Sequence, residues 1–154
     1  MKLAIGCDNA GTSLLDVVRQ VLRERGIEYE DYGVNQDDQA LYPDVALRVS
    51  ERVASGEVDR GVLICGTGIG MSITANKVPG VLAALVHDTY SAERAQLSNN
   101  AQVITMGARV IGDELARAII EKWLDAHYED NERSGPKVKR MCEIDEAYRQ
   151  KRMT

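Results

Sequence analysis

Residues 62–71, with the sequence VLICGTGIGM, decide the fold of this chain. The apolar run at 62–65 predicts a buried strand, and three alternating glycines follow it. Gly66, Gly68 and Gly70 let the backbone turn sharply and approach a ligand closely, and they present successive N–H donors where a helix begins. The stretch therefore predicts a strand-to-helix turn that cradles an anion.

Cys65 ends the predicted strand, directly before the glycines. A helix N-terminus favours the thiolate form of a cysteine, which makes Cys65 a candidate base or nucleophile near neutral pH. A buried structural cysteine before an ordinary strand-to-helix turn fits the same residues. Both interpretations stay open on this stretch alone.

Short apolar runs alternate with longer amphipathic segments along most of the chain. Strands are expected at 2–6, 28–32, 61–65, 81–86 and 102–106, and helices at 13–25, 42–54 and 113–128. Strands that are apolar on both faces and are joined by helices predict a parallel sheet with right-handed crossovers. The fold class is α/β: a doubly wound, Rossmann-like three-layer αβα sandwich with a five-stranded parallel sheet.

Four segments are expected at the carboxyl edge of this sheet, where ligands bind in such folds. They are residues 7–9, 65–70, 87–88 and 107–109, each placed directly after a predicted strand. We therefore expect the ligand site at this edge.

The last quarter of the chain differs in character. Residues 129–136 are polar and rich in turn formers, and 138–150 place apolar residues among many charges. We expect one domain over 1–128, followed by a linker and a C-terminal helix over 129–154. That helix packs either on its own domain or on a partner subunit.

Composition excludes several classes of protein. The chain has 154 residues and a formal net charge of −5, which argues against a general nucleic-acid binder. No stretch approaches the roughly 20 apolar residues that span a bilayer, so we expect a cytoplasmic protein without membrane contact. The three cysteines, at positions 7, 65 and 142, indicate neither a disulfide framework nor a metal site.

Several separated motifs resemble the ribose-5-phosphate isomerase B and galactose-6-phosphate isomerase family. They run in order from residue 1 to about residue 128: AIGCD (4–8), YPD (42–44), LICGTGIGMS (63–72), ANKVPG (75–80), HDTYSA (87–92), NN (99–100) and MGARVIG (106–112). The resemblance implies aldose–ketose isomerisation of a phosphorylated sugar through a cis-enediolate, without a metal or cofactor.

The resemblance also implies roles for the residues around the glycine turn. Cys65 is the carbon-acid base, Asp8 moves the proton between the two substrate oxygens, and Thr67 binds a sugar hydroxyl or the enediolate. Backbone donors stabilise the developing oxyanion; they belong to Gly66, Gly68, Ile69 and Gly70. A branch of the family uses a glutamate base at the position of Ile69, so this chain belongs with the cysteine branch.

Phosphate binding and assembly are further implications of the resemblance. Arg109 is the expected phosphate ligand, since a guanidinium makes bidentate bonds with phosphate. Arg133 and Lys137 keep a pair of positive charges where relatives have a basic tail motif. The family forms homodimers or dimers of dimers with shared active sites, and Asn99 and the tail are expected to contribute across the subunit boundary.

Two family histidines are missing, and their replacements bear on the substrate. Asn9 and Ser98 stand in their places, and the histidine at the second position is credited with opening the sugar ring. A tetrose 4-phosphate stays acyclic, because closure through O3 would make a strained four-membered ring. We expect an erythrose 4-phosphate and erythrulose 4-phosphate pair, with ribose 5-phosphate and ribulose 5-phosphate as the alternative.

Two other functions fit parts of the glycine turn. Cys65 as a nucleophile would indicate a thiol phosphatase, although no arginine follows it closely in the sequence. The spaced glycines also occur in nucleotide-binding modules, but the third glycine of a dinucleotide fingerprint would fall at Met71.

Overall fold

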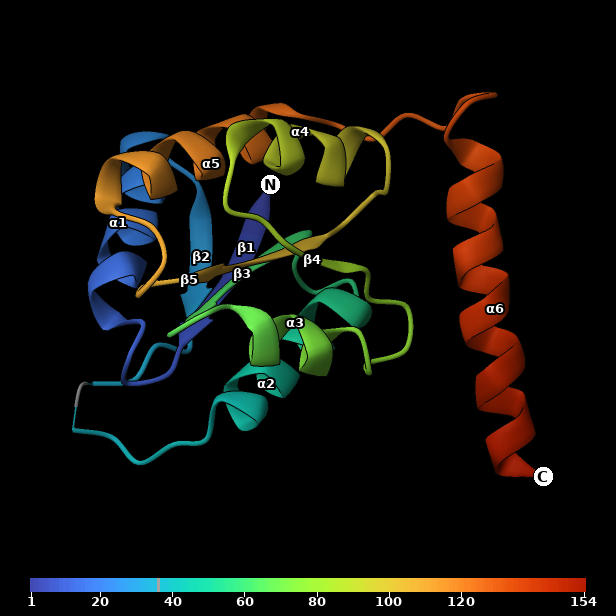
Figure 1. Cartoon of the computed structure of the whole chain (residues 1–154), viewed down its shortest axis with the longest axis horizontal. Helices are drawn as coiled ribbons and strands as arrows, with labels where there is room; N and C mark the ends of the chain where they lie inside the picture. Colours follow the sequence, from blue (N-terminus) through green and yellow to red (C-terminus); the bar gives the residue numbers. More distant parts are fainter. Residues whose placement is uncertain (36) are drawn as a thin grey trace.

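A computed structural model, describing residues 1–35 and 37–154, shows a parallel sheet covered by helices on both faces (Figure 1). The strand order is β2-β1-β3-β5-β4. The strands are β1 Lys2–Cys7, β2 Glu28–Asp31, β3 Arg60–Cys65, β4 Ala83–Leu85 and β5 Val103–Gly107. The helices are α1 Thr12–Glu24, α2 Tyr42–Ala54, α3 Ile69–Ala75, α4 Thr89–Leu97, α5 Asp113–Asp125 and α6 Gly135–Met153. The predicted fold class is confirmed.

Each face of the sheet has its own apolar core. On one face, α1, α4 and α5 pack their apolar residues around Ile64 and Ile104, and Trp123 is fully buried there. On the other face, α2 and α3 pack against Leu63, Cys65 and Val103. Because side chains alternate along β3, Ile64 and Cys65 point to opposite faces.

The ends of two helices differ from the sequence expectation. Helix α5 stops at Asp125 rather than residue 128, since the Arg60 guanidinium donates hydrogen bonds to the carbonyls of Trp123 (2.6 Å) and Ala126 (2.7 Å). Helix α6 begins at Gly135, inside the expected linker. Pro136 lies in its first turn, where a missing N–H breaks no helical bond.

Helix α6 stands beside the main body rather than in its core (Figure 1). Val138 near its start is buried, and Arg149 donates a hydrogen bond to the carbonyl of Lys77 after α3 (3.2 Å). Ile144 and Tyr148 on the same helix are exposed. No helix in the described part of the chain is long and apolar enough to cross a membrane.

Replacing Arg60 by Met is expected to lower the free energy of unfolding by about 3 kcal/mol. The substitution leaves two carbonyls without the hydrogen bonds that the buried guanidinium now donates to them. The Arg60 residue is 7% exposed and its guanidinium also lies 5.1 Å from the centre of the Trp123 ring. Urea denaturation measures the loss. Arg140→Met is the control: that side chain on α6 is 69% exposed, and we expect a change within about 0.5 kcal/mol. Equal losses in both variants would contradict the role given to Arg60.

Candidate active site

The turn between β3 and α3 holds the thiol of Cys65 against backbone donors. Cys65 is buried, and the N–H of Gly68 donates a hydrogen bond to its sulfur at 3.1 Å. Gly68 has a φ of 77°, in the left-handed region, and α3 begins at the next residue. An N–H directed at sulfur stabilises negative charge there, so the turn suits a thiolate.

Two glycines allow this turn to press against the end of β5. A Cβ atom on Gly68 would come within 2.8 Å of the Met106 backbone, and one on Gly107 within 2.6 Å of the Thr67 backbone. Both contacts are closer than side chains allow. The two loops therefore meet backbone to backbone.

Hydrogen bonds stabilise the contact between the glycine turn and the end of β5. The N–H of Ala108 donates to the carbonyl of Cys65 (2.9 Å), and the N–H of Arg109 donates to the carbonyl of Gly66 (3.0 Å). The hydroxyl of Thr105 donates to the carbonyl of Gly68 (2.8 Å). The position of the sulfur is thus tied to β5.

The Arg109 side chain lies over the glycine turn. A Cβ on Gly66 would be 3.1 Å from its Nη1 atom, and the residue is exposed. Thr67 is also exposed, and its hydroxyl accepts a hydrogen bond from the N–H of Ile69 (3.2 Å). A guanidinium, a hydroxyl and backbone N–H groups together can bind a phosphorylated polyol.

Asp8 and Asn9 lie at the same edge. The N–H of Asp8 donates to the carbonyl of Ile64 (3.2 Å), which places Asp8 beside the residue before Cys65. One carboxylate oxygen accepts a bond from the N–H of Ala10 (3.0 Å). Gly11, not Asp8, is the N-cap of α1, so the Asp8 carboxylate does not cap this helix. Asn9 is exposed.

His87 supports the site from behind. Its Nε2 accepts a hydrogen bond from the N–H of Gly107 (2.9 Å), which requires the proton of the neutral ring to be on Nδ1. Burial lowers the pKa of His87. Its neighbour Asp88 caps α4 by accepting from the N–H of Ser91 (2.6 Å), and this bond lowers the pKa of the carboxyl.

Tyr42 is a residue of this edge to which sequence reasoning gave no role. Its ring lies directly against Gly70, where it would collide with a side chain at that position. Tyr42 belongs to the YPD motif, which could have marked it as a residue of the site. Nothing in that motif indicates which residue the ring contacts. The Tyr42 ring therefore packs against one side of the glycine turn.

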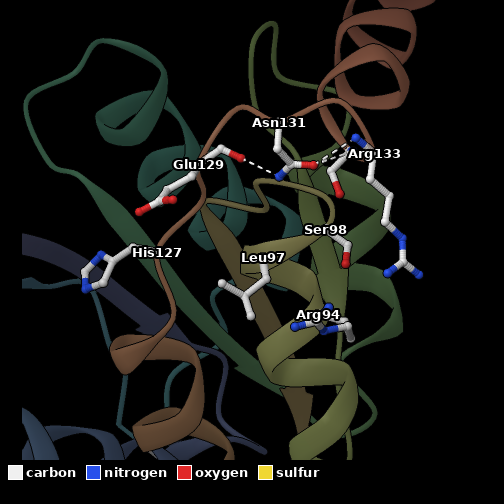
Figure 2. Close-up of a pocket in the computed structure, with 8 residues that line it drawn as sticks. Arg94, Leu97, Ser98, His127, Glu129, Asn131 and Arg133 are labelled. Atoms are coloured by element: carbon white, nitrogen blue, oxygen red, sulfur yellow. Dashed lines mark hydrogen bonds between the residues drawn. The ribbon is translucent and has the colours of Figure 1, made fainter.

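A second group of predicted residues lies elsewhere. Ser98 and Arg133 line a cavity of about 430 Å³ together with Arg94, Leu97, His127, Glu129, Asn131 and Ser134 (Figure 2). Asn99 follows Ser98 in the loop before β5, and Lys137 is exposed on α6. Arg94 was not among the residues predicted from the sequence.

The cavity and Cys65 lie at opposite ends of the sheet. Arg60 at the start of β3 contacts the residues around His127, whereas Cys65 ends the same six-residue strand. At about 3.3 Å per residue, a strand of this length spans roughly 17 Å. One chain therefore brings Cys65, Asp8, Asn9, Thr67 and Arg109 together, and keeps Ser98, Asn99 and Arg133 apart from them.

The other two thiols differ from Cys65 in their surroundings. Cys7 is buried in the core of the opposite face, and burial raises its pKa to about 11. Cys142 is exposed on α6. Of the three cysteines, only Cys65 lies at the glycine turn. Among the described residues there is no cluster of histidine, cysteine and carboxylate side chains that could hold a metal ion.

Comparison with known proteins places this arrangement among isomerases. The sequence model of a family described as Ribose/Galactose Isomerase matches residues 3–141. The chain is 49% identical over 149 residues to the ribose-5-P isomerase B of Listeria innocua, covering 97% of this chain and 100% of that protein. It is 49% identical over 142 residues to the D-erythrulose-4-phosphate isomerase of Pectobacterium atrosepticum, covering 92% and 93%.

A solved structure agrees with these relatives. The ribose-5-phosphate isomerase B of Clostridium thermocellum superimposes with a TM-score of 0.91 at 41% identity, covering 96% of this chain and 99% of that one. These similarities favour isomerisation over a thiol phosphatase or a nucleotide-binding module.

The bond from Gly107 to His87 predicts a pH dependence of stability. Since burial lowers the pKa of His87 in the folded chain, the unfolded chain binds the proton first, and stability is lost as pH falls below about 6.5 through the folded pKa. For a single proton the slope reaches at most about 1.4 kcal/mol per pH unit. In urea denaturation between pH 8 and pH 5, we expect wild type to lose more stability than His87→Gln. Parallel pH profiles would contradict this assignment.

Proposed function

Because the chain belongs to the Ribose/Galactose Isomerase family of sugar-phosphate isomerases, we propose that Cys65 is the base that moves a proton between C1 and C2 of its substrate. The observation that carries this proposal is the hydrogen bond from the Gly68 N–H to the Cys65 sulfur at 3.1 Å. It places the Cys65 thiol against a turn of backbone N–H donors.

The chemistry balances with the groups at this edge. The Cys65 thiolate removes the proton from C2 of the aldose, and the C–H electrons form the C1–C2 double bond of a cis-enediolate. Negative charge moves to the former carbonyl oxygen, where the donors of the 66–70 turn stabilise it. Asp8 transfers the hydroxyl proton from O2 to O1, which moves the negative charge to O2. The thiol then returns its proton to C1, the C2–O2 carbonyl forms, and the ketose results.

The active site is completed by a second copy of the chain. Ser98, Asn99 and Arg133 lie a strand length away from Cys65 in their own chain, so those of a partner supply the other half in a homodimer or a dimer of dimers. The surface beside the glycine turn supports this assembly: Ile69 and Ile73 of α3 are 52% and 56% exposed, and Leu47 of α2 is exposed nearby in the same layer. An apolar patch of this kind is typical of an interface.

The substrate is a tetrose 4-phosphate, in keeping with the absence of a ring-opening histidine at position 98. The chain has two histidines. His87 uses its Nε2 to bind Gly107. His127 lies at the margin of the Ser98 cavity, but Arg60 Nη2 is 3.3 Å from its Nδ1, and its ring points away from Ser98 (Figure 2). Relatives named for erythrulose 4-phosphate and for ribose 5-phosphate are both close, so ribose 5-phosphate is the second candidate.

Replacing Cys65 by Ala is expected to lower kcat by about 10²- to 10⁴-fold, the usual contribution of a positioned general base. Coupled assays measure turnover, and circular dichroism checks the fold. Cys142→Ala is the matched control, since that thiol is exposed on α6 and should leave turnover unchanged. Near-normal turnover of the Cys65→Ala variant would refute the base.

Substrate preference is tested by comparing kcat/KM for the two sugar phosphates. We expect at least about a tenfold preference for erythrose 4-phosphate over ribose 5-phosphate, because ribose 5-phosphate closes to a furanose and wild type has no group to open that ring. Ser98→His should raise kcat/KM for the cyclic pentose and leave the acyclic tetrose little changed. A wild-type preference for the pentose would overturn the tetrose assignment and favour the ribose 5-phosphate alternative.

A further inference from the structure

We propose that Arg94 is a substrate-binding residue that holds the phosphate group together with Arg133. This inference rests on the proposed function, because the sugar phosphate must reach the Ser98 cavity. It adds a ligand from α4, one helical turn before Ser98, to which neither the motifs nor the sequence pattern assigned a role.

Among the described residues, Arg94 lacks the hydrogen-bonded carboxylate partner that several other arginines have. Its Nε atom is buried without a hydrogen-bond partner. The nearest carboxylate in the described part of the chain is Glu93, 3.9 Å from Nη2 and beyond hydrogen-bonding distance. By contrast, Arg19 and Arg117 each donate to a carboxylate at 2.7 Å. A guanidinium left without an acceptor beside a cavity is a ready anion ligand.

A second guanidinium faces the same cavity. Arg133 extends from the tail loop toward the level of Ser98 and Arg94 in Figure 2, whereas Glu129, the cavity's one carboxylate among the described lining residues, points to the other side. Two like charges that share a cavity repel each other. A phosphate dianion removes this repulsion and accepts hydrogen bonds from both arginines.

The loop that carries Arg133 is held by Asn131. Its side-chain oxygen accepts bonds from the N–H groups of Arg133 (3.0 Å) and Ser134 (2.9 Å), and its amide donates to the carbonyl of Glu129 (2.8 Å). The backbone of Arg133 is therefore fixed before a ligand binds, which lowers the entropy lost on binding.

Gln96 joins the two walls of the cavity. Its side chain is buried, donates to the carbonyl of Ala101 (3.0 Å) and accepts from the N–H of Tyr128 (3.1 Å). The loop after α4 and the segment leading to the tail are thus held at a fixed distance. Arg94 and Arg133 come from these two walls.

Ser98 lies beside Arg94 at the end of α4. Arg94 and Ser98 are four residues apart at the end of α4, so they lie on the same side of the helix. Both residues line the same cavity. A phosphate held by Arg94 therefore lies within the cavity that Ser98 also lines.

The test is Arg94→Met, with Arg94→Lys as the second variant and Arg140→Met as the matched control. For Arg94→Met we expect KM for the sugar phosphate and the inhibition constant of inorganic phosphate to rise about ten- to a hundredfold, the effect of losing a hydrogen bond between charged groups. The kcat should change by less than about threefold, since the proton transfer occurs at Cys65. Arg94→Lys should lie between the two, because Lys keeps the charge and loses the fork.

Binding of inorganic phosphate, measured by calorimetry, separates this inference from the proposed function. If wild type turns over neither sugar phosphate, the proposed function fails; weaker phosphate binding in Arg94→Met would still support Arg94 as an anion ligand. If wild type is active and a folded Arg94→Met or Arg94→Lys variant keeps the wild-type KM and phosphate affinity, the inference about Arg94 is overturned. Arg140→Met should match wild type in both measurements.

Discussion

The close backbone contact between the turn after β3 and the end of β5 is the constraint on which the site depends. Gly68 and Gly107 leave no room for a side chain between the two segments, and the carbonyls of Cys65 and Gly66 accept bonds from the residues after β5. The same contact positions the Cys65 sulfur, the Gly68 N–H and the backbone of Arg109. His87 supports this contact from the next segment of the chain, because its Nε2 accepts a hydrogen bond from the N–H of Gly107. Main-chain geometry therefore holds the thiol, the donor and the backbone of Arg109.

The direction of the sheet explains why the remaining predicted residues lie elsewhere. Parallel strands put every strand-to-helix turn at one end and every helix-to-strand loop at the other. Cys65, Asp8 and Arg109 follow strands, whereas Ser98 and Asn99 precede β5. In the proposed homodimer, the cavity of one copy faces the glycine turn of the other copy. The two copies then enclose the substrate between the cavity and the turn.

Local patterns of apolar and polar residues predict much of the fold. All five strands and helix 42–54 follow from apolar periodicity and are confirmed. The edge that gathers Cys65 with residues 107–109 follows from strand direction. Local patterns do not indicate which residues far apart in the sequence form hydrogen bonds with each other. Arg60 ends α5 through carbonyls more than sixty residues away. Pro136 has the sequence character of a linker residue, although it lies in the first turn of α6. The buried Nε of Arg94, which has no hydrogen-bond partner, likewise becomes visible only in the folded structure.

The central claim is that the proposed active site is shared between two copies, with Cys65 from one and Asn99 from the other. It is tested most directly by coexpressing Cys65→Ala and Asn99→Ala chains, each inactive alone and differently tagged, and by purifying the mixed dimer. One of its two sites then has both wild-type residues, so we predict about half of the wild-type turnover per dimer. A purified mixed dimer without activity would contradict the account, because it would mean that both residues must come from the same chain.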